Sequence, residues 1–80
     1  GATVLENKRR KLSFKEQKEL DSLPGMIEAT ENAISELHEQ MAAPEFYKQA
    51  SELIVKANEQ LQHLEAKLQE LYTRLEELDG

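Results

Sequence analysis

The sequence predicts an all-α fold: an antiparallel two-helix coiled-coil hairpin with a short N-terminal helix packed at its base. Apolar residues of the second half recur at alternating spacings of three and four, which average to the coiled-coil period of 3.5. Two prolines divide the 80 residues into helical stretches, and only 5% of the residues are aromatic. A chain this short and this poor in aromatic residues favours a narrow helix–helix seam over a thick globular core.

The first helix is expected at residues 14–22. Ser13 followed three positions later by Glu16 is the capping-box pattern, in which each side chain binds the other residue's free backbone N–H group. Pro24 should end or sharply bend this helix, because proline lacks an N–H group and disfavours helix in the residue before it. The expected division is a flexible basic linker at residues 1–12, of which residues 1–5 are a linker end or a cloning remnant, and a hairpin domain at residues 13–80.

Two long helices are expected at about residues 24–42 and 48–78, joined by a short turn at Pro44. Because a short connection makes neighbouring helices antiparallel, folding the chain here pairs residues whose numbers sum to about 95. All of these pairs except Thr30 with Leu64 are apolar on both sides, which supports the register. The apolar pairs are Met41–Ile54, Leu37–Ala57, Ile34–Leu61, Ile27–Leu68 and Leu23–Leu71.

Both ends of this hairpin need to be closed. The last helix is longer than its partner, so leucines such as Leu78 extend past the end of the seam. We expect Phe14 and Leu20 of the first helix to cover them. At the other end, the adjacent aromatic residues Phe46 and Tyr47 are expected to fill the open tip.

The sequence contains no pattern typical of catalysis or metal binding. It has no Cys and no glycine-rich phosphate loop, and its two histidines, His38 and His63, fall at different heights on the hairpin. No apolar run approaches the ~20 residues of a membrane span, and the start lacks a signal-peptide pattern. We therefore expect a non-enzymatic segment with no cofactor, no metal site and no membrane contact.

Positive charge gathers near the start of an otherwise acidic chain. The sequence has 10 Lys and Arg against 16 Asp and Glu, yet six of the basic residues lie between positions 8 and 18. Such a cluster either neutralises phosphates without reading a base sequence or serves as a solubilising linker. Base stacking is not predicted, because no aromatic platform is expected beside it. The candidate nucleic-acid-binding residues are Lys8, Arg9, Arg10, Lys11, Lys15 and Lys18.

Three segments bring this chain close to one protein family. The stretches "KLSFKEQKELDSLP" from residue 11, "APEFY" from residue 43 and "YTRLEEL" from residue 72 resemble the C-terminal domain of ABC-F ATPases of the Uup type. The resemblance implies a coiled-coil hairpin that is associated with DNA binding and follows two ATP-binding cassettes, which are absent here. It also implies an intracellular parent that hydrolyses ATP and acts around ribosomes or DNA. Ala43 and Leu75 stand where the family usually has aspartate and tryptophan.

Two functional hypotheses follow. The leading one is a non-catalytic, cytoplasmic domain of an ABC-F ATP-binding protein that contacts DNA or ribosomal RNA through phosphates, without sequence preference. The alternative is a protein-interaction or dimerisation module that docks on the ribosome, on the ATPase cassettes or on a second copy. Because the leucine stripe is used within one chain, the hairpin is expected to be a monomer, and the sequence is expected to be a fragment of a larger protein.

Overall fold

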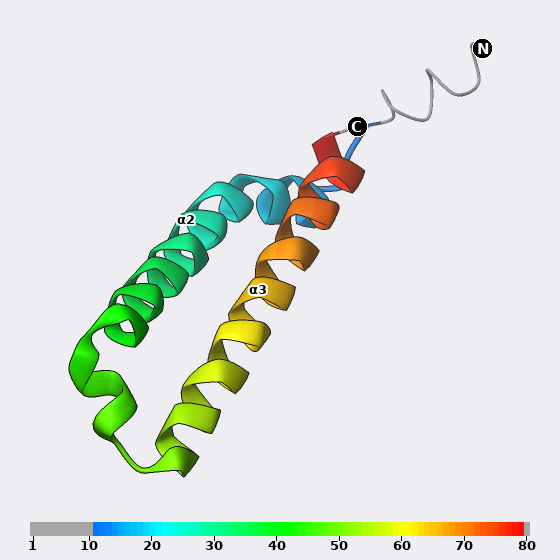
Figure 1. Cartoon of the computed structure of the whole chain (residues 1–80). Coiled ribbons are helices and arrows are strands. Elements are labelled where there is room, and N and C mark those ends of the chain that lie inside the picture. The colour runs from blue at the N-terminus through cyan, green and yellow to red at the C-terminus, as the bar shows by residue number, and fades with distance from the viewer. Residues whose placement is uncertain (1–10, 80) are drawn as a thin grey trace.

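The computed structural model describes residues 11–79 and confirms the all-α hairpin. It contains the helix α2 (Phe14–Ala42), a short 3₁₀ helix η1 (Pro44–Lys48) and the helix α3 (Ser51–Asp79). The two long helices run in opposite directions and are joined through η1 at the tip (Figure 1). Each has 29 residues, so each would be about 43 Å long if straight.

The capping box at the start of α2 is confirmed. The Ser13 hydroxyl oxygen accepts a hydrogen bond from the Glu16 N–H group at 3.0 Å, and the Ser13 N–H group donates to Glu16 Oε1 at 2.9 Å. Two backbone donors that the helix itself cannot satisfy are thereby paired. The first turn of α2 consequently has a fixed starting point and direction.

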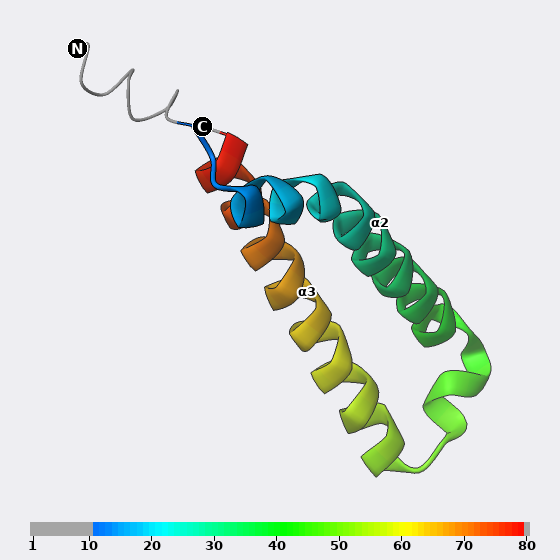
Figure 2. The ribbon, with the colours of Figure 1, turned by 180° about the vertical axis from the view of Figure 1, so that it is seen from behind.

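The predicted break between two helices at residues 22–24 is wrong. One continuous helix runs from Phe14 to Ala42 with Pro24 inside it. The helix bends in the stretch that contains Pro24, so its first turns cross the far end of α3 (Figures 1 and 2). The proline ring removes one backbone hydrogen bond and collides with the carbonyl group four residues earlier, which kinks a helix without having to end it. Pro24 is exposed, whereas Leu23 and Ile27 beside it are buried.

The core lies at the base of the hairpin and follows the predicted register. Leu23 is 2% exposed and belongs to one buried cluster with Ile27, Leu71 and Leu78. This places the predicted pair Leu23–Leu71 in a single core. The half-buried residues packed against the cluster are Leu12, Leu20, Leu68 and Leu75. All the residues of the predicted pairs are buried or half-buried.

The one polar position in the seam is satisfied within its own helix. Thr30 is only 4% exposed, and its hydroxyl donates to the Met26 carbonyl oxygen at 2.8 Å. A buried hydroxyl without a partner would cost free energy, so this bond explains how Thr30 is tolerated opposite the leucines of α3. Across the helices, the Tyr72 hydroxyl donates to Glu31 Oε2 at 2.9 Å, and this bond raises the pKa of Tyr72.

The two ends of the hairpin are closed differently from the prediction. At the base, Leu20 packs against the core as expected, but Phe14 is 83% exposed and Leu12 packs there instead. At the tip, Phe46 is buried, whereas Tyr47 is 66% exposed and meets Phe46 edge to face, with ring centroids 5.0 Å apart. At each end, one of the two residues expected to close the hairpin packs in the interior and the other is exposed to solvent.

The start of the last helix also differs from the prediction. Lys48 ends η1, and α3 begins at Ser51 rather than at residue 48. Pro44 begins η1, where its missing N–H group is not needed. The Gln49 side-chain amide donates to the Phe46 carbonyl oxygen at 3.1 Å and holds the end of this short helix.

Gly25→Ala tests whether the bend requires glycine. A Cβ atom at this position would meet no heavy atom within 4 Å, and the residue lies inside a helix. Alanine should therefore stabilise the fold by about 0.5–1 kcal/mol, because glycine in a helix interior costs conformational entropy. Thermal unfolding followed by circular dichroism should show a midpoint raised by roughly 2–8 °C.

The matched control is Leu23→Ala, which removes a core side chain two residues away. It should lower the free energy of unfolding by about 2–5 kcal/mol. A lower melting temperature for Gly25→Ala would contradict the expectation and show that the bend depends on glycine at this position.

Candidate nucleic-acid interface

Three of the six candidate phosphate-binding residues lie within the described chain, and all three are exposed. Lys11 precedes the cap of α2, while Lys15 and Lys18 lie in its first two turns. Lys8, Arg9 and Arg10 lie outside the described residues. Lys15 and Lys18 are three positions apart, so they neighbour each other on the helix surface. We call Lys11, Lys15 and Lys18, together with Phe14, the basal face.

Phe14 is an unexpected member of this face. The Lys18 Nζ atom lies 5.7 Å from the centroid of the Phe14 ring, within range of a cation–π contact. Lys15 follows Phe14 directly in the sequence, so the exposed ring has a cation on the next residue as well. The basal face therefore combines positive charge with an aromatic ring.

Carboxylates alternate with these lysines along the sequence. The hydrogen bonds and ion pairs of these carboxylates determine whether they bind the lysines or other groups. Residues 11–21 carry three lysines and three acidic groups, Glu16, Glu19 and Asp21. Glu16 accepts the capping bond from Ser13, and Asp21 accepts a hydrogen bond from the Gln17 amide at 3.0 Å. Within residues 11–79, the ion pairs both belong to Arg74. The three lysine side chains are thus exposed and hold no ion-pair partner among the described residues.

Glu19 is bound by Arg74 of α3. The Arg74 Nε atom donates to Glu19 Oε2 at 2.7 Å and Nη2 donates to Oε1 at 2.9 Å, a two-pronged contact between residues 55 positions apart. The hydrogen bonds to Arg74 lower the pKa of Glu19 and outweigh the opposing effect of partial desolvation. Arg74 also donates to Glu77 at 3.2 Å, and the two carboxylates raise its own pKa.

This ion pair connects the basal face to α3. It joins the first turns of α2 to the last turns of α3, where Leu20 packs against the core. A bidentate pair fixes orientation better than a single contact, because two parallel hydrogen bonds restrict the guanidinium plane. Arg74 and Glu19 therefore position the lysines relative to the hairpin. Within the described residues, Glu19 and Glu77 are the two carboxylates that bind Arg74.

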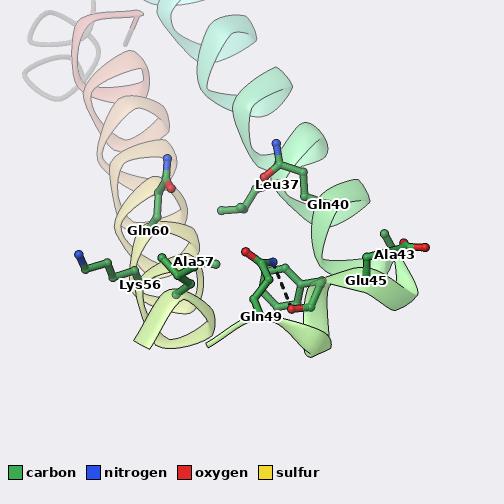
Figure 3. A pocket seen from close by; sticks show the side chains of 10 residues that line it. Leu37, Gln40, Ala43, Glu45, Gln49, Lys56, Ala57 and Gln60 are labelled. Carbon is green, nitrogen blue, oxygen red and sulfur yellow. Dashed lines mark hydrogen bonds between the residues drawn. The ribbon is translucent and has the colours of Figure 1, made fainter. Parts of the chain in front are cut away.

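A second feature lies at the opposite end of the hairpin. A groove of about 550 Å³ opens between α2, η1 and α3, with Leu37, Phe46 and Ala57 among its apolar lining residues (Figure 3). The amides of Gln40, Gln49 and Gln60 and the ammonium group of Lys56 also line it. The carboxylate of Glu45 lines the groove as well.

The described residues offer no metal centre and no membrane span. No group of three or more His, Cys, Asp or Glu side chains in residues 11–79 is arranged to hold a metal ion. Neither α2 nor α3 contains a stretch that is both long and apolar enough to cross a bilayer.

Comparison with known proteins supports the sequence resemblance. The family model described as ABC transporter C-terminal domain matches residues 11–79. Two curated proteins of Haemophilus influenzae, named ATP-binding protein Uup-like and ATP-binding protein Uup, are each 44% identical to the chain over 43 residues. That segment covers 54% of this chain but only 9% and 7% of the two relatives. No solved structure matches.

Glu19→Gln tests the ion pair through its pH dependence. Since the pKa of Glu19 is lowered in the folded chain, its contribution to stability is present above the ordinary carboxyl value of 4.5. This contribution is lost as the pH falls through the lower folded value. The melting temperature of Glu19→Gln should consequently fall less between pH 6 and pH 2 than that of the unchanged chain. The difference should be small, because both side chains are more than a third exposed and water screens the pair.

Glu36→Gln is the control, since Glu36 is an exposed glutamate on the same helix. It should leave the pH profile close to that of the unchanged chain. Identical profiles for Glu19→Gln and Glu36→Gln would show that the contact with Arg74 adds nothing measurable to folding.

Proposed function

The chain belongs to the ABC transporter C-terminal domain family, and from this premise we propose that it is a non-catalytic domain that binds DNA phosphates through its basal face. Its parent would be an ATP-binding protein like the two Haemophilus influenzae relatives, and the binding of ATP would be left to other parts of that parent. The proposal includes a cytoplasmic location, where ATP and DNA are both present.

The observation that carries this proposal is the exposure of Lys11, Lys15 and Lys18 on one end of the hairpin. Glu19, a carboxylate beside them, is bound to Arg74, so its charge is largely balanced from the other side. At the start of α2, the Glu16 carboxylate of the capping box already lies at the positive end of the helix dipole, so the phosphate contacts are assigned to the lysines. Lys8, Arg9 and Arg10 would extend the same charge along the preceding chain.

This arrangement supports affinity without sequence preference. Lysine ammonium groups neutralise phosphates and release counterions, which stabilises a complex equally on any base sequence. The basal face, as defined by its four described residues, contains no Arg, Asn or Gln. These are the side chains that recognise a base edge through two parallel hydrogen bonds. Ribosomal RNA carries the same phosphates. Comparing the affinity for duplex DNA with that for a duplex RNA of equal length therefore decides between the two polymers.

A salt titration with duplex DNA tests the proposal. We expect the logarithm of the association constant to fall linearly with the logarithm of the salt concentration. Lys15→Ala combined with Lys18→Ala should lower the magnitude of that slope by about two, since each contacting lysine contributes about one. Fluorescence anisotropy of a labelled duplex between about 50 and 200 mM salt measures both quantities.

The chain offers a control matched in charge. Lys56→Ala combined with Lys67→Ala removes the same two positive charges from exposed positions of α3. These changes should leave the slope unchanged. Equal effects of the two double variants would mean that only net charge matters, and the proposed interface would be abandoned.

The interaction-module alternative has one observation in its favour. Leu53 lines the groove at the tip and is 50% exposed. Tyr47 and Val55, next in sequence to the lining residues Phe46 and Lys56, are more than half exposed as well. Such a partly apolar end is where a second copy of the hairpin would pack. We nevertheless favour the monomer, because the core leucines Leu23 and Leu71 are already buried within one chain.

Sedimentation equilibrium distinguishes a monomeric hairpin from one that associates through its tip. We expect a single species of 9.2 kDa at micromolar concentration. A dimer that dissociates when Leu53 is replaced by Asp, with helix content retained, would instead support association through the tip. The substitution should have no effect on the sedimentation of a chain that is already monomeric.

A further inference from the structure

Phe14 is more exposed than any other large apolar side chain of the described residues, at 83%. Its neighbours Leu12 and Leu20 pack against the core at the same end of the hairpin. The side chain thus lies next to an apolar core yet does not join it, and it forgoes the burial free energy that such a position would give.

The position of the ring is well defined. Phe14 is the first residue of α2, directly after the Ser13 cap, and the capping box holds this turn in place. The Lys18 ammonium group lies 5.7 Å from the centroid of the ring, and Lys15 is the next residue along the helix. At 83% exposure, the ring keeps an accessible surface even with Lys18 nearby. The result is an exposed aromatic ring in the first turn of a helix, with one lysine ammonium group close to it.

Unpaired nucleotides have the chemistry that fits this surface. A nucleobase outside a duplex presents an open π-face, and its phosphate lies a few ångströms from the base. Proteins that bind single strands combine aromatic rings for the bases with lysines for the phosphates. An intact duplex, in contrast, exposes only base edges and phosphates, so an aromatic ring gains little from it.

We propose that Phe14 is a base-stacking residue and that the basal face prefers nucleic acid with unpaired nucleotides. The ring stacks on one unpaired base, while Lys15 and Lys18 contact the phosphates beside it. This inference rests on the proposed phosphate-binding function and adds a substrate preference to it. It also replaces the expectation from sequence that no aromatic platform accompanies the lysines.

Phe14→Leu separates stacking from charge, because it keeps an apolar side chain and all the lysines. Its binding to an oligothymidine of about 12 nucleotides should weaken by about 5- to 100-fold, the effect of losing one stacked base. Its binding to a duplex of equal length, and to inorganic polyphosphate, should change less than twofold. Tyr47→Leu, which removes an exposed ring at the far end of the hairpin, should not alter binding to any of the three.

A second variant reports stacking directly. The chain contains no Trp, so Phe14→Trp introduces a single tryptophan, whose emission can be excited apart from that of the two tyrosines, at the ring position. Its emission should be quenched by oligothymidine and not by polyphosphate, and its affinity should equal or exceed that of the unchanged chain. Tyr47→Trp should show no quenching with either ligand. Circular dichroism of each variant confirms that the helices remain formed.

Three results would overturn the inference. Equal losses of Phe14→Leu on oligothymidine, duplex and polyphosphate would mean that the ring only positions the lysines. No loss on oligothymidine would mean that the ring contacts no base. Quenching of Phe14→Trp by poly-glutamate as strong as by oligothymidine would assign the face to an acidic protein. A different result would contradict the proposed phosphate-binding function itself. In that case, the combined Lys15→Ala and Lys18→Ala change would leave binding to duplex DNA and to polyphosphate unaltered.

Discussion

Burial of the leucine stripe between α2 and α3 of one chain is the constraint on which the rest of the structure depends. Leu23 and Ile27 of α2 lie in one core with Leu71 and Leu78 of α3. This packing sets the register, and the register places Glu19 beside Arg74 although 55 positions separate them. The basal face is therefore a consequence of the seam: the leucines align the helices, and the ion pair then orients the first turns of α2.

The register was predictable because a two-position seam leaves few ways to pair the helices. Glu19 and Arg74 also fit this register, since their numbers add up to nearly the same value as those of the seam pairs. Whether Pro24 ends the helix or only bends it was not predictable from the local sequence, because proline is compatible with both outcomes. Tertiary packing decides the outcome, because Leu23 and Ile27, on the two sides of Pro24, are both buried in the core at the base.

The composition of the candidate site was partly predictable for a related reason. Exposure of Lys11, Lys15 and Lys18 follows from their charge, and the structure confirms it. The direction of Phe14 could not be read from the pattern, because Phe14, Leu12 and Leu20 compete for the same end of the core. Only two of the three pack there. The basic residues at positions 8–10 lie outside the described chain, so their part in the interface stays a prediction.

Much of the acidic charge of the chain lies far from its base. Charges in physiological salt are screened over about 8 Å. Glu52, near the start of α3, lies 22 residues from Arg74, which corresponds to about 33 Å along the helix. Carboxylates at such distances hardly affect the potential at Lys15. At the near end, Arg74 balances one charge of the two carboxylates that it binds, Glu19 and Glu77. Carboxylates near the tip are therefore screened from the basal face, and the net charge of −6 includes groups that hardly act there.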